Sequence, residues 1–211
     1  MSRTTFRRAH CVAALALGAA LAGAQDLPDA PEVRVRGAAA VADSPSTYAG
    51  ALAAWKSPED IAHFAGVRFS YDRDRALTLA ETADAGAVRP PIYPPEALYA
   101  NPSGMCVDLA RFGVETLNRI DPAFASRYLM LEFHPVQVEG RTLRRHWLAS
   151  FMRDGQWWFF ADSRRPGHVA GPYANVEAFI ADYQSYRRQA IVAWRVADGY
   201  GRRTRVQAAR R

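Results

Sequence analysis

Residues 146–162, HWLASFMRDGQWWFFAD, predict two antiparallel strands joined by a tight turn. Aromatic and aliphatic residues fill both arms, a composition typical of strands. Asp154-Gly155 between them is a dipeptide that favours hairpin turns, because both residues tolerate positive φ. The stretch therefore predicts an antiparallel sheet at the centre of the fold.

Further strands and helices are expected on both sides of this hairpin. A helix is expected to start at Ser57-Pro58 and to end near Gly66, because serine caps helices and proline suits the first helical position. The Pro-rich stretch 84–103 is expected to be a loop. The other expected elements are a helix over 103–118, strands over 128–137, 143–152 and 156–161, a helix over 175–183 and a strand over 189–196. Helices followed by mostly antiparallel strands indicate an α+β fold.

The N-terminus has the composition of an export signal. A basic start precedes the apolar stretch Cys11–Leu21, and Ala22-Gly23-Ala24 is a small-residue cleavage site. The expected organisation is a signal peptide over 1–24, a linker over 25–46, one domain over 47–200 and a basic tail over 201–211. The mature protein is then expected to be secreted or periplasmic.

The formal net charge of +6 arises at the two ends of the chain. Three arginines lie in residues 1–24 and five in residues 201–211, with no acidic residue in either segment, so residues 25–200 carry a net charge of −2. A nucleic-acid partner is therefore not expected. The arginine tail is expected to be solvated and dispensable for folding, with a weak contact to an anionic surface as the alternative.

Removal of the signal takes Cys11 away and leaves Cys106 as the single cysteine. A lone thiol in an oxidising compartment is an inert buried residue, an intermolecular partner or a nucleophile. If Ser103 caps the following helix, Cys106 lies in its first turn, where the helix dipole favours the thiolate. Gly104 allows the close approach of another chain or a substrate. Cys106 is therefore a candidate nucleophile.

A cysteine nucleophile needs a base, and four histidines follow residue 24. His63 lies on the early helix, His134 on a strand and His168 in a turn-rich loop. Only His146 has an obvious carboxylate partner, because the hairpin returns to Asp162. Such a carboxylate fixes the imidazole tautomer and stabilises its protonated form. A purely structural His–Asp pair at a sheet end is the alternative.

The turn decides whether His146 and Asp162 share a face of the hairpin. A two-residue turn pairs Arg153 with Gln156 and puts the two side chains on opposite faces. A three-residue turn with a left-handed glycine pairs Met152 with Gln156, so that His146 faces Asp162. The Asp-Gly dipeptide favours the shorter turn, but catalysis requires the longer one, which we predict. The active-site face is then expected to carry His146, Leu148, Ser150, Met152, Gln156, Trp158, Phe160 and Asp162.

These residues together resemble the transglutaminase-like superfamily. The pattern is a G-x-C-x-D-x-A helix start, then a histidine 40 residues after the cysteine and an aspartate 16 residues further on, here Gly104, Cys106, Asp108, Ala110, His146 and Asp162. Residues 93–98, YPPEAL, are similar to the segment before the Cys helix in bacterial transglutaminase-like cysteine proteinases. The resemblance covers about residues 55–197.

The resemblance implies a papain-like core in which Cys106 is the nucleophile, His146 the base and Asp162 the orienting residue. It also places Tyr93 near the oxyanion side, where those proteinases usually have tryptophan. Gly104 and Trp147 are further candidates for the oxyanion or substrate side. Because Met105 and Val107 flank the cysteine where those proteinases usually have acidic residues, and Asp108 alone is a weak ligand set, calcium is not carried over. Neither a metal nor another cofactor is expected.

Three functions are compatible with these residues. The first is an exported thiol enzyme that hydrolyses or transfers an amide bond of a protein or peptide through a thioester. The second is a cell-wall peptide amidase of the NlpC/P60 type, which Val107-Asp108 and Asp162 disfavour. The third is a non-catalytic periplasmic binding or assembly module, which an intact triad disfavours. Substrate identity and oligomeric state are not predicted.

Overall fold

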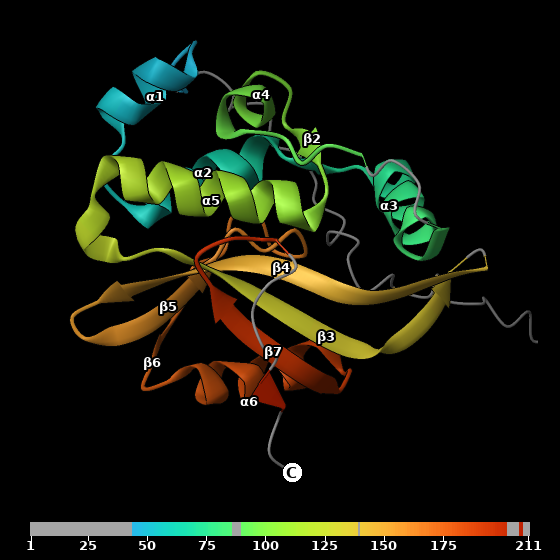
Figure 1. Cartoon of the computed structure of the whole chain (residues 1–211). Coiled ribbons are helices and arrows are strands. Elements are labelled where there is room, and N and C mark those ends of the chain that lie inside the picture. The colour runs from blue at the N-terminus through green and yellow to red at the C-terminus, as the bar shows by residue number, and fades with distance from the viewer. Residues whose placement is uncertain (1–43, 86–89, 139, 202–206, 209–211) are drawn as a thin grey trace, which may run out of the picture.

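The computed structural model describes residues 44–85, 90–138, 140–201 and 207–208 (Figure 1). The expected export signal and residues 25–43 of the expected linker lie outside these ranges. The described elements, in chain order, are α1 (Tyr48–Ala54), α2 (Pro58–Arg68), β1 (Ser70–Tyr71), α3 (Arg73–Ala85), α4 (Pro95–Ala100), β2 (Ser103–Gly104), α5 (Cys106–Ile120), the 3-10 helix η2 (Pro122–Phe124), β3 (Arg127–Val138), β4 (Arg141–Arg153), β5 (Gln156–Phe160), β6 (Ala170–Tyr173), α6 (Val176–Arg187), β7 (Ile191–Ala197) and β8 (Gln207–Ala208).

A six-stranded sheet with the order β6-β5-β4-β3-β7-β8 forms the middle layer. Every neighbouring pair in it is antiparallel. Helices α2 and α5 lie on one face of the sheet and α6 on the other (Figure 1). This mixture of helices with an antiparallel sheet confirms the expected α+β class.

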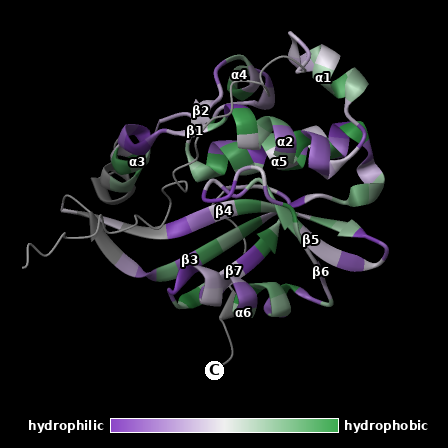
Figure 2. Ribbon diagram, turned by 180° about the vertical axis from the view of Figure 1, so that it is seen from behind, coloured by the Kyte–Doolittle hydropathy of each residue, from purple (hydrophilic) through white to green (hydrophobic). Residues whose placement is uncertain are grey.

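Each face of the sheet buries its own hydrophobic core. On the α5 side, Trp147, Ala149 and Phe151 of β4 pack with α2, α4 and α5. On the α6 side, Leu148 and Phe159 pack with the buried face of α6. Figure 2 shows hydrophobic residues along the strands that lie between the two helical layers. The sheet therefore separates two apolar layers, and alternate residues of β4 enter different layers.

The start of α2 follows the expectation. Ser57 caps the helix and accepts a hydrogen bond from the Asp60 amide, while Asp60 accepts one from the Ser57 amide. Pro58 occupies the first helical position. This capping box satisfies backbone donors that a helix start would otherwise leave unpaired.

The start of α5 differs from the expectation. Met105, not Ser103, precedes the first helical residue, Cys106. Ser103 instead belongs to β2, which pairs in parallel with β1, because the Ser70 amide donates to the Pro102 carbonyl at 2.8 Å. The apolar residues that recur every three or four positions along α5, namely Val107, Ala110, Val114 and Leu117, are all buried, so one side of the helix packs inward.

The hairpin forms where it was expected, but the predicted three-residue turn is wrong. Arg153 pairs with Gln156, so Asp154-Gly155 forms a two-residue turn. Asp154 and Gly155 have φ angles of 54° and 72°, the left-handed values that match a hairpin turn to the twist of its strands. Local turn chemistry therefore determines the register.

The shorter turn also changes the predicted face. Phe151 pairs with Trp158, and Ala149 pairs with Phe160. Cross-strand partners share a face, so Trp158 and Phe160 lie on the α5 side. The prediction that they share a face with Leu148 is wrong.

The stretch 84–103 is not a continuous loop, because it contains α4 and β2. The arginine tail is also not wholly solvated, because Gln207–Ala208 pairs with Ala193 and Trp194 of β7. Neither α1, α3 nor β6 was expected from the sequence. Within the described residues, none of the helices has the length and hydropathy needed to cross a bilayer.

Candidate active site

The structure brings His146 and Asp162 together. The Nε2 atom of His146 lies 2.8 Å from Oδ1 of Asp162. His146 has no exposed surface, and Asp162 is 4% exposed. The predicted contact is confirmed, although the predicted register that was meant to produce it is wrong.

Ala161 explains how the short turn permits this contact. Its φ is 55°, in the left-handed region, so the chain leaves the strand conformation after Phe160. Asp162 then belongs to a turn, in which its backbone pairs with Arg165. Side-chain alternation along β5 does not extend to Asp162, and the carboxylate turns back to His146.

Asp162 is held as a carboxylate by several donors. Oδ1 also accepts a hydrogen bond from the Arg164 amide at 2.9 Å, and Oδ2 accepts one from the Tyr183 hydroxyl at 2.9 Å. The Nε atom of Arg165 lies 3.6 Å from Oδ2. Burial by itself raises the pKa of Asp162, but the hydrogen bond and charge of His146, followed by the charge of Arg187, outweigh it and hold the pKa well below its ordinary value.

Cys106 is the first residue of α5, so it lies in the first turn as expected. It forms no disulfide bond with any residue that the structure describes, and 7% of its surface is exposed. The amides of this turn and the helix dipole favour negative charge on its sulfur. The thiol therefore occupies a position that suits a nucleophile.

Helix α5 packs against the strand that carries His146. Cys106 and Trp147, the residue after His146, belong to one buried cluster. Gly113 of α5 lies so close to the hairpin that an added Cβ would be 2.7 Å from the Cβ of Ala161. The pairing of β4 with β5 reaches only to Ala149, so the 161–165 turn, rather than a strand, lies beside His146. His146 is thus at an open end of the hairpin.

Asp108 links the start of α5 to two other segments. Its carboxylate is completely buried and accepts hydrogen bonds from the Met105 amide at 2.8 Å and the Tyr93 amide at 2.7 Å. It also forms an ion pair with Arg75 of α3 at 2.7 Å. The guanidinium of Arg75 lies 3.8 Å from the ring centroid of Tyr93. Tyr93 is therefore tethered to the helix that begins with Cys106.

The two remaining candidates for the substrate side lie inside the protein. A Cβ on Gly104 would be 3.0 Å from the Asp108 carboxylate and from a Leu98 methyl group. The close neighbours of Gly104 within the protein are therefore the side chains of Asp108 and Leu98. Trp147 is 9% exposed, and its ring packs edge-on against Tyr128 at 6.3 Å.

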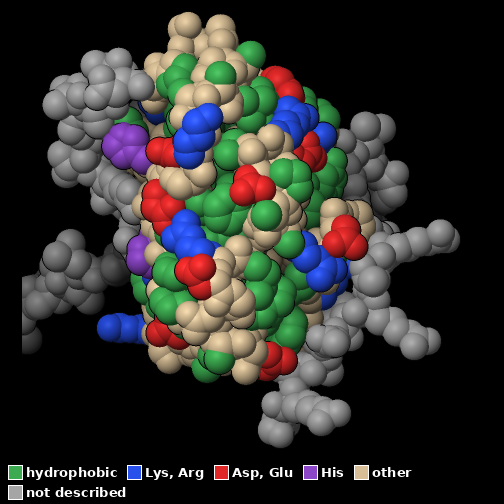
Figure 3. All heavy atoms as spheres, turned by 90° about the vertical axis from the view of Figure 1, so that its left-hand side faces the viewer, with side chains coloured by type: hydrophobic (Ala, Val, Ile, Leu, Met, Phe, Trp, Pro, Cys, Tyr) green, Lys and Arg blue, Asp and Glu red, His purple; other side chains and the backbone are tan. Residues whose placement is uncertain are grey.

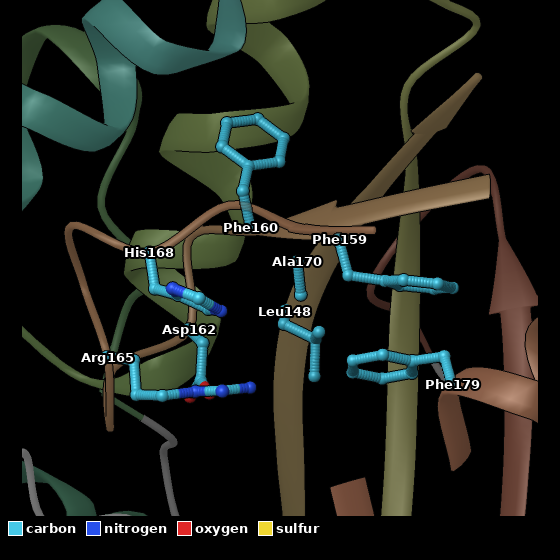
Figure 4. A pocket seen from close by; sticks show the side chains of 8 residues that line it. All are labelled: Leu148, Phe159, Phe160, Asp162, Arg165, His168, Ala170 and Phe179. Atoms are coloured by element: carbon cyan, nitrogen blue, oxygen red, sulfur yellow. The ribbon is translucent and has the colours of Figure 1, made fainter. Parts of the chain in front are cut away.

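The other three histidines that the structure describes occupy exposed positions. His63 and His134 are exposed, on α2 and β3. His168 is also exposed, and it lines a small pocket beside Asp162 with Arg165 and Phe179 (Figure 4). This pocket has about 10 Å³ of space for water, roughly one molecule.

Sequence reasoning did not find Tyr183 and Arg187, which complete the surroundings of Asp162. The expected helix over 175–183 contained Tyr183, but no motif distinguished this tyrosine from the others. A polar aromatic residue on the inward face of an amphipathic helix was the only available signal.

In the part of the chain that the structure describes, no three His, Cys, Asp or Glu side chains gather to hold a metal ion. Acidic and basic side chains are interspersed with hydrophobic ones on the face shown in Figure 3. Comparison with family models finds no match, and no curated protein matches the chain.

Proposed function

We propose that the protein is a thiol enzyme of the transglutaminase-like type, with a Cys106–His146–Asp162 triad that acts on an amide bond of a protein or peptide. The observation that carries this proposal is the buried hydrogen bond between Nε2 of His146 and Oδ1 of Asp162. A carboxylate on Nε2 fixes the ring and leaves Nδ1 as the nitrogen that serves the thiol.

The proposed arrangement places Sγ of Cys106 beside Nδ1 of His146. Three features support it: α5 packs on β4, Cys106 shares a cluster with Trp147, and β5 ends before it reaches His146. Because β5 does not pair with β4 at His146, the start of α5 on one face of the sheet can approach the His146 ring, which extends from the other face. A Cys helix packed on an antiparallel sheet that carries His146, with Asp162 in the turn after β5, also supports a papain-like core.

The chemistry of this triad has two stages. The Cys106 thiolate attacks the amide carbon, and protonated His146 gives its proton to the leaving amine as the C–N bond breaks, which leaves a thioester on the protein. Neutral His146 then takes a proton from water or from a second amine, whose attack on the thioester carbon expels the Cys106 thiolate and restores the thiolate–imidazolium pair. Asp162 stabilises the imidazolium form in both stages.

Alkylation of Cys106 by iodoacetamide across pH tests this proposal, with the label located by peptide mass spectrometry. We expect an apparent pKa well below about 8.5, the value of a model thiol. His146→Ala should bring the profile back toward that value, whereas His134→Ala, on an exposed strand position, serves as the matched control. A wild-type thiol that titrates at the model value would overturn the proposal and favour the non-catalytic module.

We also propose that the protein is exported by residues 1–24. Mass spectrometry of the protein from the periplasm or medium should find Gln25 as its first residue. An intact Met1 end on the exported protein would contradict this.

A further inference from the structure

Tyr183 lies directly behind the His146–Asp162 pair. It is completely buried, and its hydroxyl is 2.9 Å from Oδ2 of Asp162. Its ring stacks on the imidazole of His146 with 6.2 Å between centroids and 7° between planes. One side chain from α6 therefore contacts both members of the pair.

Arg187 determines where the proton of this hydroxyl points. It follows Tyr183 by one helical turn, and its Nη1 atom lies 3.0 Å from the Tyr183 oxygen. A guanidinium can only donate, so the tyrosine oxygen accepts from Arg187 and its single proton is directed to Asp162. Burial, followed by the charge of Asp162, raises the pKa of Tyr183 to about 12, so the hydroxyl keeps this proton at neutral pH.

We propose that Tyr183 is a positioning residue for the triad: its hydroxyl fixes Asp162, its ring fixes the plane of His146, and Arg187 orients the hydroxyl. The consequence for catalysis rests on the proposed function, whereas the effect on the His146–Asp162 pair does not.

The direction of the effect follows from the groups around Asp162. These are His146 on β4, the Arg164 amide and the Arg165 guanidinium in the turn, Tyr183 and Arg187 on α6, and His168 at the nearby pocket. Removing the Tyr183 hydroxyl takes one donor from the carboxylate. Its negative charge then acts more strongly on the imidazolium, so His146 should hold its proton to higher pH.

The test is Tyr183→Phe, which keeps the ring and removes the hydroxyl. Titration of histidine-labelled protein by NMR should show the pKa of His146 rising by about 0.5 to 1 unit. The proton in the His146–Asp162 hydrogen bond should also exchange faster with water, because its carboxylate is less firmly held. Tyr173→Phe is the matched control, since it removes a hydroxyl that donates to the exposed carboxylate of Asp182. A folded Tyr183→Phe protein with wild-type titration and exchange would overturn the inference.

A second variant covers the case in which Tyr183→Phe does not fold. Arg187→Gln keeps the tyrosine but removes the charge that orients its hydroxyl, and it should also raise the His146 pKa and speed the exchange. Unchanged values in this variant would overturn the inference as well. Iodoacetamide profiles of the same samples separate the two proposals: an ordinary wild-type thiol refutes the triad alone, whereas unmoved His146 values refute the role of Tyr183 alone.

Discussion

The ionisation of Asp162 makes the stability of the protein depend on pH. Its pKa is depressed in the folded state, so it stabilises the fold above its unfolded pKa, and this contribution disappears as the pH falls toward the folded value. The substitution Asp162→Asn replaces the titrating carboxyl group with an amide that does not ionise. Between about pH 5 and about pH 2, its free energy of unfolding should fall less than that of the wild type.

Urea denaturation at several pH values measures this difference. Asp154→Asn is the control, because it removes an exposed carboxyl from the hairpin turn. Equal acid dependence in wild type and Asp162→Asn would contradict the assignment. The same variant should keep its fold at neutral pH and lose most of its turnover, since the imidazole tautomer is no longer fixed.

Asp108 is structural, because its carboxylate binds the backbone amides of Met105 and Tyr93 and the guanidinium of Arg75 on α3. In Asp108→Asn, an amide group would face the Met105 or Tyr93 amide or the Arg75 guanidinium, so a buried donor would lose its acceptor. We expect a loss of about 2–4 kcal/mol in the free energy of unfolding.

Thermal and urea denaturation check this expectation. Glu96→Gln breaks an ion pair with Arg119 in which both side chains are at least two-fifths exposed, and it should cost less than about 1 kcal/mol. Similar losses in the two variants would show that Asp108 behaves as a surface charge.

At the scale of elements, the close contact between α5 and the hairpin depends on Gly113. A Cβ there would lie 2.7 Å from the Cβ of Ala161 and 3.3 Å from that of Ala149. Gly113→Ala should therefore lower the free energy of unfolding by about 1–3 kcal/mol, although alanine is the better helix former. Gly199→Ala, where nothing lies within 4 Å of an added Cβ, is the control. A Gly113→Ala protein that is more stable than the wild type would contradict this prediction and show that α5 can shift away from the hairpin to make room for the methyl group.

The hairpin illustrates what the sequence could predict at this scale. Its two strands were predictable from their aromatic and aliphatic composition. Its turn was predictable because aspartate and glycine both tolerate the positive φ angles that a two-residue hairpin turn needs. The register prediction failed because it assumed that side chains alternate as far as Asp162. A left-handed alanine at position 161 ends the alternation, and nothing in a single sequence marks such a residue.

Other elements were missed because they depend on distant partners. Ser103 is a good capping residue, but its segment pairs with Ser70, which lies far away in the sequence. The contact of Tyr183 with Asp162 likewise joins separate elements across the sheet. Local patterns therefore predicted the contact between His146 and Asp162, but not the residues that support this pair.

At the scale of the whole molecule, the basic tail adds only a short edge strand. Truncation after Gly201 removes β8 but keeps the Gly201 carbonyl that accepts a hydrogen bond from Arg195. Because β8 has two residues, we expect a loss of less than about 1 kcal/mol in the free energy of unfolding. Thermal denaturation of the truncated and full chains measures it. A truncated protein that fails to fold would show that β8 is essential to the sheet.

Helix α6 comes late in the chain, after all three residues of the proposed triad. A nascent polypeptide thus presents Cys106, His146 and Asp162 before the helix that contacts His146 and Asp162 has been synthesised. The sheet is also incomplete at that stage, because β7, the neighbour of β3, follows α6. The His146–Asp162 pair then acquires its contacts with Tyr183 only in the last part of translation, so premature termination before Val176 would yield a chain with the residues of the proposed triad but without this support.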